Sequence, residues 1–375
     1  MRAGVLTKRG SEEIAALEVK EIITAKHIET KPRMALFDAD LADLLKLAYL
    51  GQSFSKVFVA LDSFSASNID ELKEHARTCD VSPWISEKTL FYTEAIRDGH
   101  HEFSSQHLFE DLGKIIRERT QAVVATKDHE VLFLSIVVDD ACVLGIDITK
   151  ADLGKRDYRI FPNQQSLSPL IAYAMLRWAG FDGKKTLVDC FMKSGEIIIE
   201  TALFALGKSP HFYRKDKFQF LKMPQFQQID FVKMTEKADG QMKDSKIDVS
   251  GYDSNMRNVK AAQKNAKIAG VQKSLWMSRV DVSWLELKQK ENAVDCIVTQ
   301  LPMYTVHADH DKIAKIHDEF FYQAEFVLKK KGVIVVACRT EDGVEDKAEK
   351  YKFKPEWKKE VFQGQEKILV WKFGK

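Results

Sequence analysis

Residues 186–206 read Thr-Leu-Val-Asp-Cys-Phe-Met-Lys-Ser-Gly-Glu-Ile-Ile-Ile-Glu-Thr-Ala-Leu-Phe-Ala-Leu, and this stretch decides the fold. A short apolar strand runs into Asp189, a turn follows, and an apolar helix begins at Glu196. Such a turn lets a ligand approach the backbone, and the N-terminus of the following helix favours anionic groups. With the single glycine at 195, an ordinary tight strand-to-helix turn explains the pattern equally well.

The same alternation of strand and helix continues to the end of the chain. Alternation of this kind predicts a doubly wound, mostly parallel sheet of the Rossmann-like α/β class. The insertion at 212–243 is too long for a simple loop and is expected to add helical or irregular cover. The expected strands are 186–188, 247–249, 274–277, 293–298, 332–337 and 367–372.

The N-terminal half has a different pattern, typical of small α+β modules. Ser11, followed by two glutamates, is an expected helix N-cap. The apolar stretch 131–138, the Asp139-Asp140 turn and the stretch 141–148 predict a hairpin. Further helices are expected at 41–49 and 107–119, and further strands at 57–61 and 89–96.

The charge balance limits where nucleic acid could bind. The chain has 375 residues, 30% of them charged, but its net charge is only +2. A nucleic-acid surface must therefore be a local patch on a chain of two or three domains. The candidates for phosphate contacts are Lys8, Arg9, Lys155, Arg156 and Arg159, although for each an ordinary solvated charge is an equal alternative.

The cysteines and the N-terminus bear on the compartment. None of the five cysteines forms a C-x-x-C pair or a zinc-finger spacing, so buried free thiols in a reducing cytoplasm are expected. Charged residues interrupt any apolar run at the start of the chain, which argues against a signal peptide. No run approaches the ~20 apolar residues that span a bilayer. These features predict a soluble cytoplasmic protein without metal.

Two carboxylates follow predicted strands of the C-terminal half. Asp253, in Ser250-Gly-Tyr-Asp, could accept hydrogen bonds from both ribose hydroxyls of a nucleoside cofactor, or could simply cap the next helix. Asp281 could accept a bond from an adenine amino group, or could be a solvated loop residue.

The strongest predicted strand runs into Gln300-Leu-Pro-Met-Tyr304. Methylation of an exocyclic amine requires acceptors directed at its N–H bonds, so that the nitrogen lone pair is free to attack. Gln300 could supply a side-chain oxygen and Leu301 a backbone carbonyl, which Pro302 would help to aim by favouring an extended residue 301. From spacing alone, an ordinary strand-ending turn is favoured.

An ordered series of motifs runs along essentially the whole chain. It comprises Leu6-Thr-Lys-Arg-Gly-Ser-Glu-Glu-Ile14, Gly99-His-His-Glu-Phe-Ser-Ser-Gln106, Leu144-Gly-Ile-Asp-Ile148, Leu153-Gly-Lys-Arg-Asp-Tyr-Arg-Ile-Phe161, Leu167-Ser-Pro169, Trp178-Ala-Gly180 and Arg214-Lys-Asp-Lys-Phe-Gln-Phe220. Taken in order, these residues resemble the THUMP-domain RNA methyltransferases, most of all the archaeal and bacterial guanine-N2 methyltransferases of tRNA. No single motif is decisive, but the series is fairly specific.

The resemblance implies four parts: a ferredoxin-like domain at 1–64, a THUMP domain at 65–150, a linker at 151–167, and a Rossmann-fold methyltransferase domain at 168–375. It also implies binding of the 3′ acceptor end of tRNA, with neither DNA nor a membrane as partner. The cofactor would be S-adenosylmethionine, held by Asp189, Ser194, Gly195, Asp253 and Asp281. The target-amine site would be Gln300, Leu301, Pro302 and Met303.

Both site motifs depart from the family pattern. The family loop reads approximately D-P-x-x-G-S-G-T, whereas this chain has Cys190, Lys193 and Glu196 in place of the proline, first glycine and threonine. Lys193 could point to solvent or pair with the carboxylate of the cofactor. Glu196 suits the helix dipole, but its negative charge would repel that carboxylate. The family's N-P-P-Y/F is Gln-Leu-Pro-Met here, with Tyr304 one residue on.

Three functions therefore stay open. The leading one is methyl transfer to the N2 amine of a tRNA guanosine by direct in-line displacement. The second is a catalytically silent RNA-binding protein that keeps the fold as a scaffold, in which case a protein partner is conceivable. The third is a Rossmann-type enzyme acting on another substrate, such as rRNA or a protein.

Overall fold

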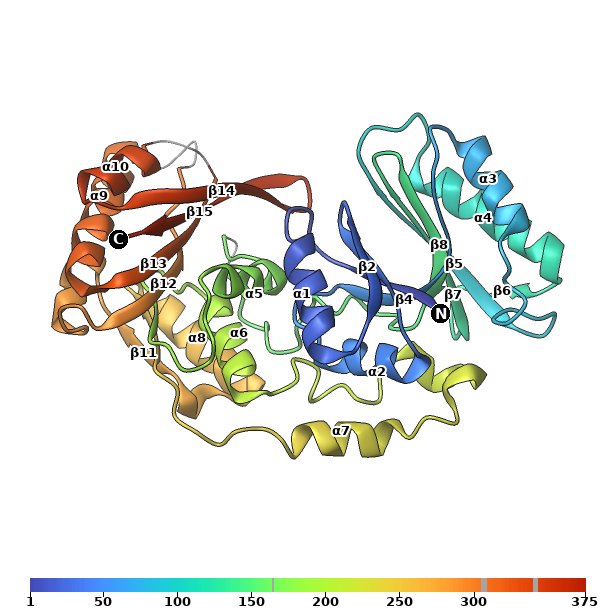
Figure 1. Ribbon diagram of the computed structural model, residues 1–375, viewed down its shortest axis with the longest axis horizontal. Helices are drawn as coiled ribbons and strands as arrows, with labels where there is room; N and C mark the ends of the chain where they lie inside the picture. Colours follow the sequence, from blue (N-terminus) through green and yellow to red (C-terminus); the bar gives the residue numbers. More distant parts are fainter. Residues whose placement is uncertain (164, 305–308, 340–342) are drawn as a thin grey trace. The chain divides into compact units, whose positions relative to one another are not determined.

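The computed structural model describes residues 1–163, 165–304, 309–339 and 343–375; Gln164, within the predicted linker, lies outside the described residues. The chain forms two compact units (Figure 1). Unit 1 comprises Met1–Leu153 and His211–Glu236, and unit 2 comprises Gly154–Pro210 and Lys237–Lys375. The chain therefore passes between the units three times.

Unit 1 is built on an eight-stranded sheet in the order β2-β3-β1-β4-β8-β7-β5-β6. The predicted hairpin is confirmed, because β7 and β8 pair antiparallel along their whole length. Strand β4 pairs with β1 on one side and with β8 on the other, so one sheet continues across the predicted boundary at residue 64. The strands are β1 Arg2–Leu6, β2 Lys26–Lys31, β3 Met34–Asp38, β4 Lys56–Ser65, β5 Leu90–Asp98, β6 Val123–Val124, β7 Val131–Val138 and β8 Ala141–Asp147.

Four helices accompany this sheet. The two predicted at 41–49 and 107–119 are present with nearly those bounds. Ser11 does precede the first helix, but its side chain accepts no capping hydrogen bond; its hydroxyl donates to the carbonyl of Lys8 instead. The helices are α1 Glu12–Ile22, α2 Leu41–Leu50, α3 Ile69–Thr78 and α4 Ser105–Thr120.

The insertion predicted at 212–243 belongs in large part to unit 1. It contains two 3-10 turns, η1 Gln219–Lys222 and η2 Pro224–Phe226, and the helix α7 Phe231–Asp239. Several of its phenylalanines are buried in unit 1: Phe231 packs edge-on against Tyr49, with ring centroids 6.0 Å apart, and Phe226 lies 6.2 Å from Trp84. The N–H of Phe220 donates to the carbonyl of Ile148 at 3.0 Å. The insertion therefore completes a core that lies elsewhere in the sequence.

Unit 2 is built on a seven-stranded sheet in the order β11-β10-β9-β12-β13-β15-β14. The first five strands are parallel, and β15 and β14 are antiparallel, so the predicted doubly wound sheet is confirmed. The strands are β9 Leu187–Asp189, β10 Val249–Asp253, β11 Trp276–Arg279, β12 Val294–Gln300, β13 Leu328–Cys338, β14 Lys354–Gln363 and β15 Glu366–Gly374.

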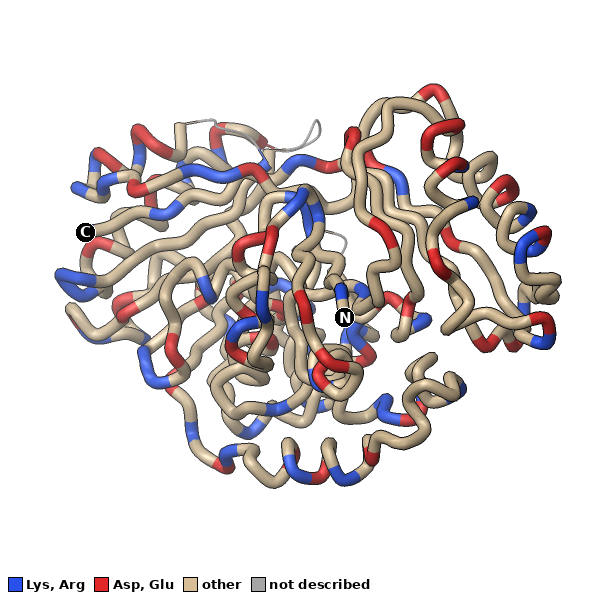
Figure 2. The backbone as a smooth tube through the Cα atoms, turned by 45° about the vertical axis from the view of Figure 1, so that its right-hand side comes forward, with Lys and Arg blue, Asp and Glu red and all other residues tan. Residues whose placement is uncertain are grey.

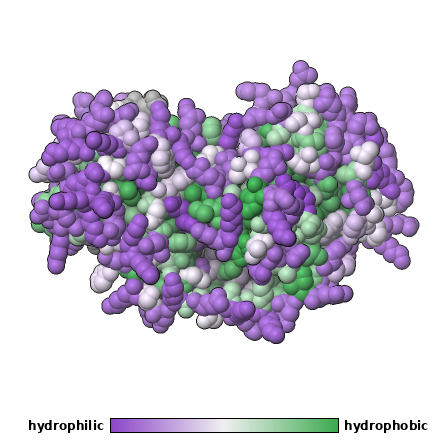
Figure 3. All heavy atoms as spheres, viewed as in Figure 1, coloured by the Kyte–Doolittle hydropathy of each residue, from purple (hydrophilic) through white to green (hydrophobic). Residues whose placement is uncertain are grey.

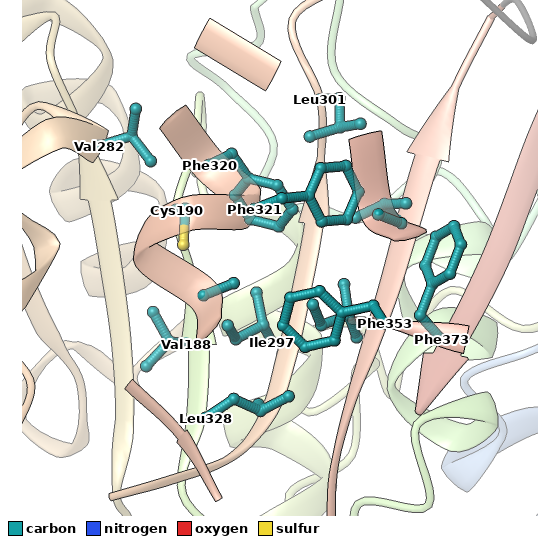
Figure 4. Packing of buried hydrophobic residues seen from close by; sticks show 14 of the residues in the cluster. Val188, Cys190, Val282, Ile297, Leu301, Phe320, Phe321, Leu328, Phe353 and Phe373 are labelled. Carbon is teal, nitrogen blue, oxygen red and sulfur yellow. The ribbon is translucent and has the colours of Figure 1, made fainter. Parts of the chain in front are cut away.

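Helices cover both faces of this sheet. Helices α5, α6 and α8 pack together on one face, while η4, α9 and α10 pack on the other (Figure 1). The second face holds a large apolar cluster, in which Val188 and Ile297 from the sheet meet Phe320 and Phe321 from α9 (Figure 4). The helices are α5 Pro169–Trp178, α6 Glu196–Leu206, α8 Met256–Ala269, η3 Gln272–Ser274, η4 Val282–Leu287, α9 His310–Val327 and α10 Val344–Lys350.

The surface and the cysteines follow the expectations from composition. All five cysteines are buried and free, as predicted. Basic and acidic residues are interspersed along the chain (Figure 2), and the face shown in Figure 3 is mostly hydrophilic. In the described ranges, no helix combines the length and the apolar character needed to cross a membrane.

The aromatic packing of the insertion generates a first prediction. Phe220 is buried and its ring lies 4.8 Å from that of Phe231, so Phe220→Ala leaves a cavity in unit 1 and should cost about 3–5 kcal/mol of stability. Urea denaturation of the full chain measures this loss. The control is Val232→Ala in the same insertion, where the side chain is 65% exposed and the change should be within about 0.5 kcal/mol. Equal effects of the two variants would contradict the packing described here.

Candidate cofactor and target-amine site

The site begins at the carboxyl end of β9 with Asp189. This carboxylate is buried; its Oδ1 accepts hydrogen bonds from the Thr299 hydroxyl at 2.6 Å and from the N–H of Phe191 at 3.2 Å. Its Oδ2 is buried without a hydrogen-bond partner among the described residues. Burial raises the pKa of Asp189 to about 7. An acceptor of this kind, on the wall of a cavity, suits a ligand that brings a hydrogen-bond donor.

The turn after β9 keeps the backbone form of a glycine-rich loop although it carries a lysine. Lys193 has a φ of +48°, in the left-handed region that glycine adopts readily and other residues seldom do. Its N–H donates to Asp253 Oδ2 at 3.0 Å, which ties the loop to the end of the neighbouring strand β10. The departure from the family motif at 193 thus changes the side chain and leaves the backbone conformation in place.

Gly195 is the N-cap of helix α6, and a side chain is poorly tolerated there. Its φ is +90°, and a Cβ there would lie 2.9 Å from the Cβ of Ala262 on α8. The absence of a side chain lets α6 and α8 approach each other behind the loop. This explains why the predicted glycine is needed, without assigning it a ligand contact.

Ser194 and Glu196 interact with each other. The Ser194 hydroxyl lies 2.8 Å from Glu196 Oε1 and accepts the N–H of Asn163 at 3.0 Å. The Glu196 carboxylate is buried and accepts the Nε of Arg159 at 2.8 Å. The helix N-terminus therefore already has an anion of its own, neutralised by a cation from the segment before α5.

The two carboxylates predicted at the next strand ends lie in different environments. Asp253 is buried, and its Oδ1 accepts the N–H of Asn255 at 2.8 Å and the Nδ2 of Asn258 at 3.0 Å. Asp281 caps the short helix η4, since its Oδ1 accepts the N–H of Ser283 at 3.1 Å. Asp281 therefore acts as a cap, whereas Asp253 supports the turn before α8, whose N-cap is Asn255, and contacts the β9 loop.

A small cavity lies where these elements meet. Its volume is about 10 Å³, close to the minimum that holds one water molecule. Its lining comes from the end of β9 and the loop after it, the start of α6, the segment before α5, and the end of β12: Ser166, Leu167, Asp189, Phe191, Met192, Lys193, Glu196, Ile197 and Gln300. The predicted cofactor residue Asp189 and the predicted target residue Gln300 thus share one cavity.

The residues around this cavity fit S-adenosylmethionine in chemistry. The partnerless Oδ2 of Asp189 is an acceptor for the ammonium group of such a cofactor, and the oxygens of Asp253 retain lone pairs for ribose hydroxyls. The cavity has room for about one water molecule only, and Lys193 is among the residues that line it. Binding therefore requires movement of the lining.

The end of β12 is held by helix α9. The Gln300 side chain is buried, with its Nε2 3.6 Å from the sulfur of Met303, and Leu301 is held by an N–H bond to the carbonyl of Ala337. His317 Nε2 lies 2.8 Å from the carbonyl oxygen of Pro302 and must donate to it. This histidine had no motif to reveal it, because it lies in the middle of an amphipathic helix.

Two aromatic contacts identify another residue of this loop. Met303 is buried, whereas Tyr304 is half-buried between His310 and His317, whose rings meet it edge-on at 5.2 Å and 5.4 Å. A half-buried aromatic ring fixed by two neighbours is a better stacking surface for a base than a buried thioether.

The predicted phosphate contact at Arg156 is wrong. Its side chain is fully buried, with Nε 3.0 Å and Nη2 3.2 Å from the two oxygens of Glu200 on α6. The Tyr158 hydroxyl donates to the same carboxylate at 2.9 Å. Arg156 and Tyr158 thus hold this segment against α6. Composition alone does not distinguish an exposed basic stretch from one whose basic residues form buried ion pairs.

The other predicted phosphate contacts are mostly engaged within the chain. Arg159 pairs with Glu196, and Arg9 Nη2 lies 2.8 Å from Asp139 Oδ2. Burial lowers the pKa of Lys8, with Asp152 opposing that shift. Lys155 is exposed, so it stays a candidate for contact with RNA.

This geometry, with carboxylates at the ends of β9 and β10 and a buried amide at the end of β12, defines a Rossmann-like methyltransferase. The family model of the RMKL-like methyltransferase domain matches residues 156–369 of the sequence. The family model of the THUMP domain matches residues 66–147. The chain belongs to the RMKL-like methyltransferase family and carries a THUMP domain. The predicted family, fold class and S-adenosylmethionine-dependent enzyme class are thereby confirmed.

Individual relatives agree with this family. The chain is 24% identical over 356 residues to the tRNA (guanine(6)-N2)-methyltransferase of Methanocaldococcus jannaschii, covering 92% of each chain. It is 29% identical over 160 residues to the ribosomal RNA large subunit methyltransferase K/L of Vibrio parahaemolyticus, covering 41% of this chain and 22% of that protein. Its fold matches a possible methylase from Clostridium difficile 630 with a TM-score of 0.83 at 19% identity, covering 100% of this chain and 97% of the other.

The buried pair between Arg156 and Glu200 generates a second prediction. Arg156→Ala leaves the Glu200 carboxylate buried and uncompensated, so the loss of stability should reach about 3–5 kcal/mol. Lys367→Ala is the control, because its pair with Glu360 is half-exposed on both sides and should contribute less than about 1 kcal/mol. Chemical denaturation of both variants checks this, and a small effect at Arg156 would show that the segment is not fastened in this way.

The environment of Asp189 generates a prediction on pH. Because its pKa is raised from 3.8 to about 7, the folded protein binds a proton that the unfolded chain has lost over this range. The contribution of Asp189 to stability therefore falls as pH rises from about 4 to about 7 and is constant above that. Asp189→Asn should remove this decline, measured as the difference in unfolding free energy between wild type and variant. Parallel pH profiles of the two proteins would contradict it.

Proposed function

We propose that the protein transfers a methyl group from S-adenosylmethionine to the N2 amine of a guanosine in tRNA, which the THUMP part of the chain binds. The observation that carries the proposal is the shared cavity, which brings the carboxylate of Asp189 and the amide of Gln300 to one place. Similarity to the M. jannaschii enzyme over 92% of both chains supports tRNA guanine as the substrate.

On the cofactor side, the bound group supplies an electrophilic methyl on a sulfonium. Asp189 accepts from the ammonium end through its partnerless oxygen, and Asp253 accepts from the ribose while it holds the backbone of Lys193. Ser194 and Gly195 shape the loop rather than contact the ligand, since the first is bonded to Glu196 and the second makes room for α8. Asp281, as the cap of η4, marks the adenine end.

On the substrate side, the chain orients an amine and leaves its lone pair free. The side-chain oxygen of Gln300 and the carbonyl of Leu301 accept the two N–H bonds, and Pro302 fixes the backbone between them and His317. We assign the stacking surface to Tyr304, with Met303 as packing beneath it. The amine proton released by the transfer goes to water, because the two acceptors are neutral amide oxygens that orient the amine without taking its proton.

Two alternatives have an observation each in their favour. The small volume of the cavity favours a silent scaffold that binds RNA without cofactor. The shorter match to a ribosomal RNA methyltransferase favours rRNA as the substrate. Transfer of radiolabelled methyl groups to unmodified tRNA and to rRNA fragments, followed by nucleoside analysis, separates all three.

Gln300 provides the sharpest test of the target site. Gln300→Ala should lower kcat on tRNA about 100-fold by removing one of the two acceptors, with unchanged affinity for S-adenosylhomocysteine in calorimetry. Lys329→Ala, at the opposite end of β12 and β13 where Lys329 pairs with Asp295, should leave kcat within about threefold. A Gln300→Ala protein that keeps full kcat would exclude Gln300 from the site.

A further inference from the structure

Lys193 is an unusual residue of the cavity, in both its backbone conformation and the burial of its side chain. Its backbone holds a left-handed conformation at φ +48°, and its side chain is only 8% exposed although it carries an ammonium group. A lysine in a loop would ordinarily extend its ammonium group into water. Here the side chain lines the cavity instead.

The ammonium group of Lys193 interacts with a backbone carbonyl and with nearby carboxylates. Its Nζ lies 3.3 Å from the carbonyl oxygen of Gln165, in the segment before α5 that closes one side of the cavity. The carboxylates of Asp189, Glu196 and Asp253 raise its pKa, while burial, the larger effect, lowers that pKa to about 8. Opposite charges thus partly offset the cost of desolvating this side chain.

The surroundings of this lysine resemble those of a bound ligand. The residues that line the cavity include the cationic Lys193 and the acidic Asp189 and Glu196, which carry the kinds of charge found at the amino-acid end of S-adenosylmethionine. Glu196 in turn has its counter-ion in Arg159. The cavity therefore has a cation beside its anions without cofactor, although Asp189 Oδ2 lacks a hydrogen-bond partner among the described residues, and it has room for about one water molecule.

We propose that Lys193 is a built-in occupant of the cofactor cavity, and that S-adenosylmethionine binds only when the Lys193 side chain leaves it. This inference rests on the proposed function, because it concerns the same cavity. It assigns Lys193 a role opposite to that of a cofactor anchor: the side chain competes with the ligand for space and for Asp189. Affinity for the cofactor is reduced by the fraction of molecules in which Lys193 stays inside.

Three substitutions separate occupancy from anchoring. Lys193→Ala removes the side chain, and Lys193→Gly also relieves the left-handed backbone, which would rescue a fold disturbed by alanine. Lys193→Met keeps most of the volume and removes the charge. The control is Lys352→Gly, which relieves a similar φ of +65° at a lysine whose side chain is 83% exposed and does not line the cavity.

Calorimetric titration of the full chain with S-adenosylhomocysteine measures binding without turnover, and thermal unfolding checks the fold of each variant. We expect Lys193→Ala and Lys193→Gly to bind at least tenfold more tightly than wild type. Lys193→Met and Lys352→Gly should stay within about threefold of wild type. Unchanged or weaker binding by both small variants overturns the role of Lys193 and leaves the proposed function standing. No binding by any protein, including both small variants, overturns the proposed function as well.

Discussion

The three residues of β9 hold the candidate site together. Leu187 and Val188 pair in parallel with β10 on one side and with β12 on the other, and Asp189 continues the pairing with Gly251. Connections leave this strand and its neighbours toward opposite faces of the sheet, which is the arrangement that opens a ligand crevice at the carboxyl ends of the strands. Thr299 on β12 donates to Asp189, and Lys193 after β9 donates to Asp253 on β10. The cofactor side and the target side are therefore linked through one short strand.

Around that strand, charges are neutralised within the protein before any ligand arrives. Arg156 and Arg159 come from the segment before α5 and pair with Glu200 and Glu196 on the first two turns of α6. A buried ion pair gives little net stability, but removal of one partner is costly, so such pairs fix the path of a segment. The segment so fixed leads into Gln165, which contacts Lys193. The basic linker motif thus controls the wall of the cavity and has little surface left for RNA.

Much of the fold of both units could be predicted, because apolar strands and turn glycines are recognisable in a sequence. The positions of β9, β12 and the hairpin β7–β8 follow from apolar runs with turn residues between them. Strands β14 and β2 could not be found in this way, since both are polar: β14 alternates exposed with half-buried residues, and β2 is mostly exposed. The strand propensity of the residues does not identify a strand that is stabilised mainly by pairing with a neighbouring strand.

For the candidate site, the sequence located the residue types but not their partners. Asp189, Asp253 and Gln300 follow predicted strands, so their approach to one edge could be foreseen. The burial of Arg156 against Glu200 could not, because residues 44 positions apart meet only after the sheet is formed. Likewise, Phe231 meets Tyr49 across a large separation in sequence, and no local pattern reveals that contact. The periodicity of apolar residues therefore does not reveal contacts between residues that lie far apart in the sequence.

The conformation of Lys193 gives the closed cavity a physical cause. A left-handed backbone costs a residue with a side chain about 1–3 kcal/mol where glycine would adopt it freely. It persists because Asp253 accepts the N–H of Lys193 and because the ammonium group donates to the carbonyl of Gln165. When the side chain leaves, the contacts in the cavity are lost while the backbone strain stays. Strain alone therefore cannot move the lysine; a ligand must replace its hydrogen bond to Gln165 and its attraction to the nearby carboxylates, and must fill its space. The affinity for the cofactor is then set by the difference in binding free energy between the cofactor and the Lys193 side chain, which are attracted by the same carboxylates.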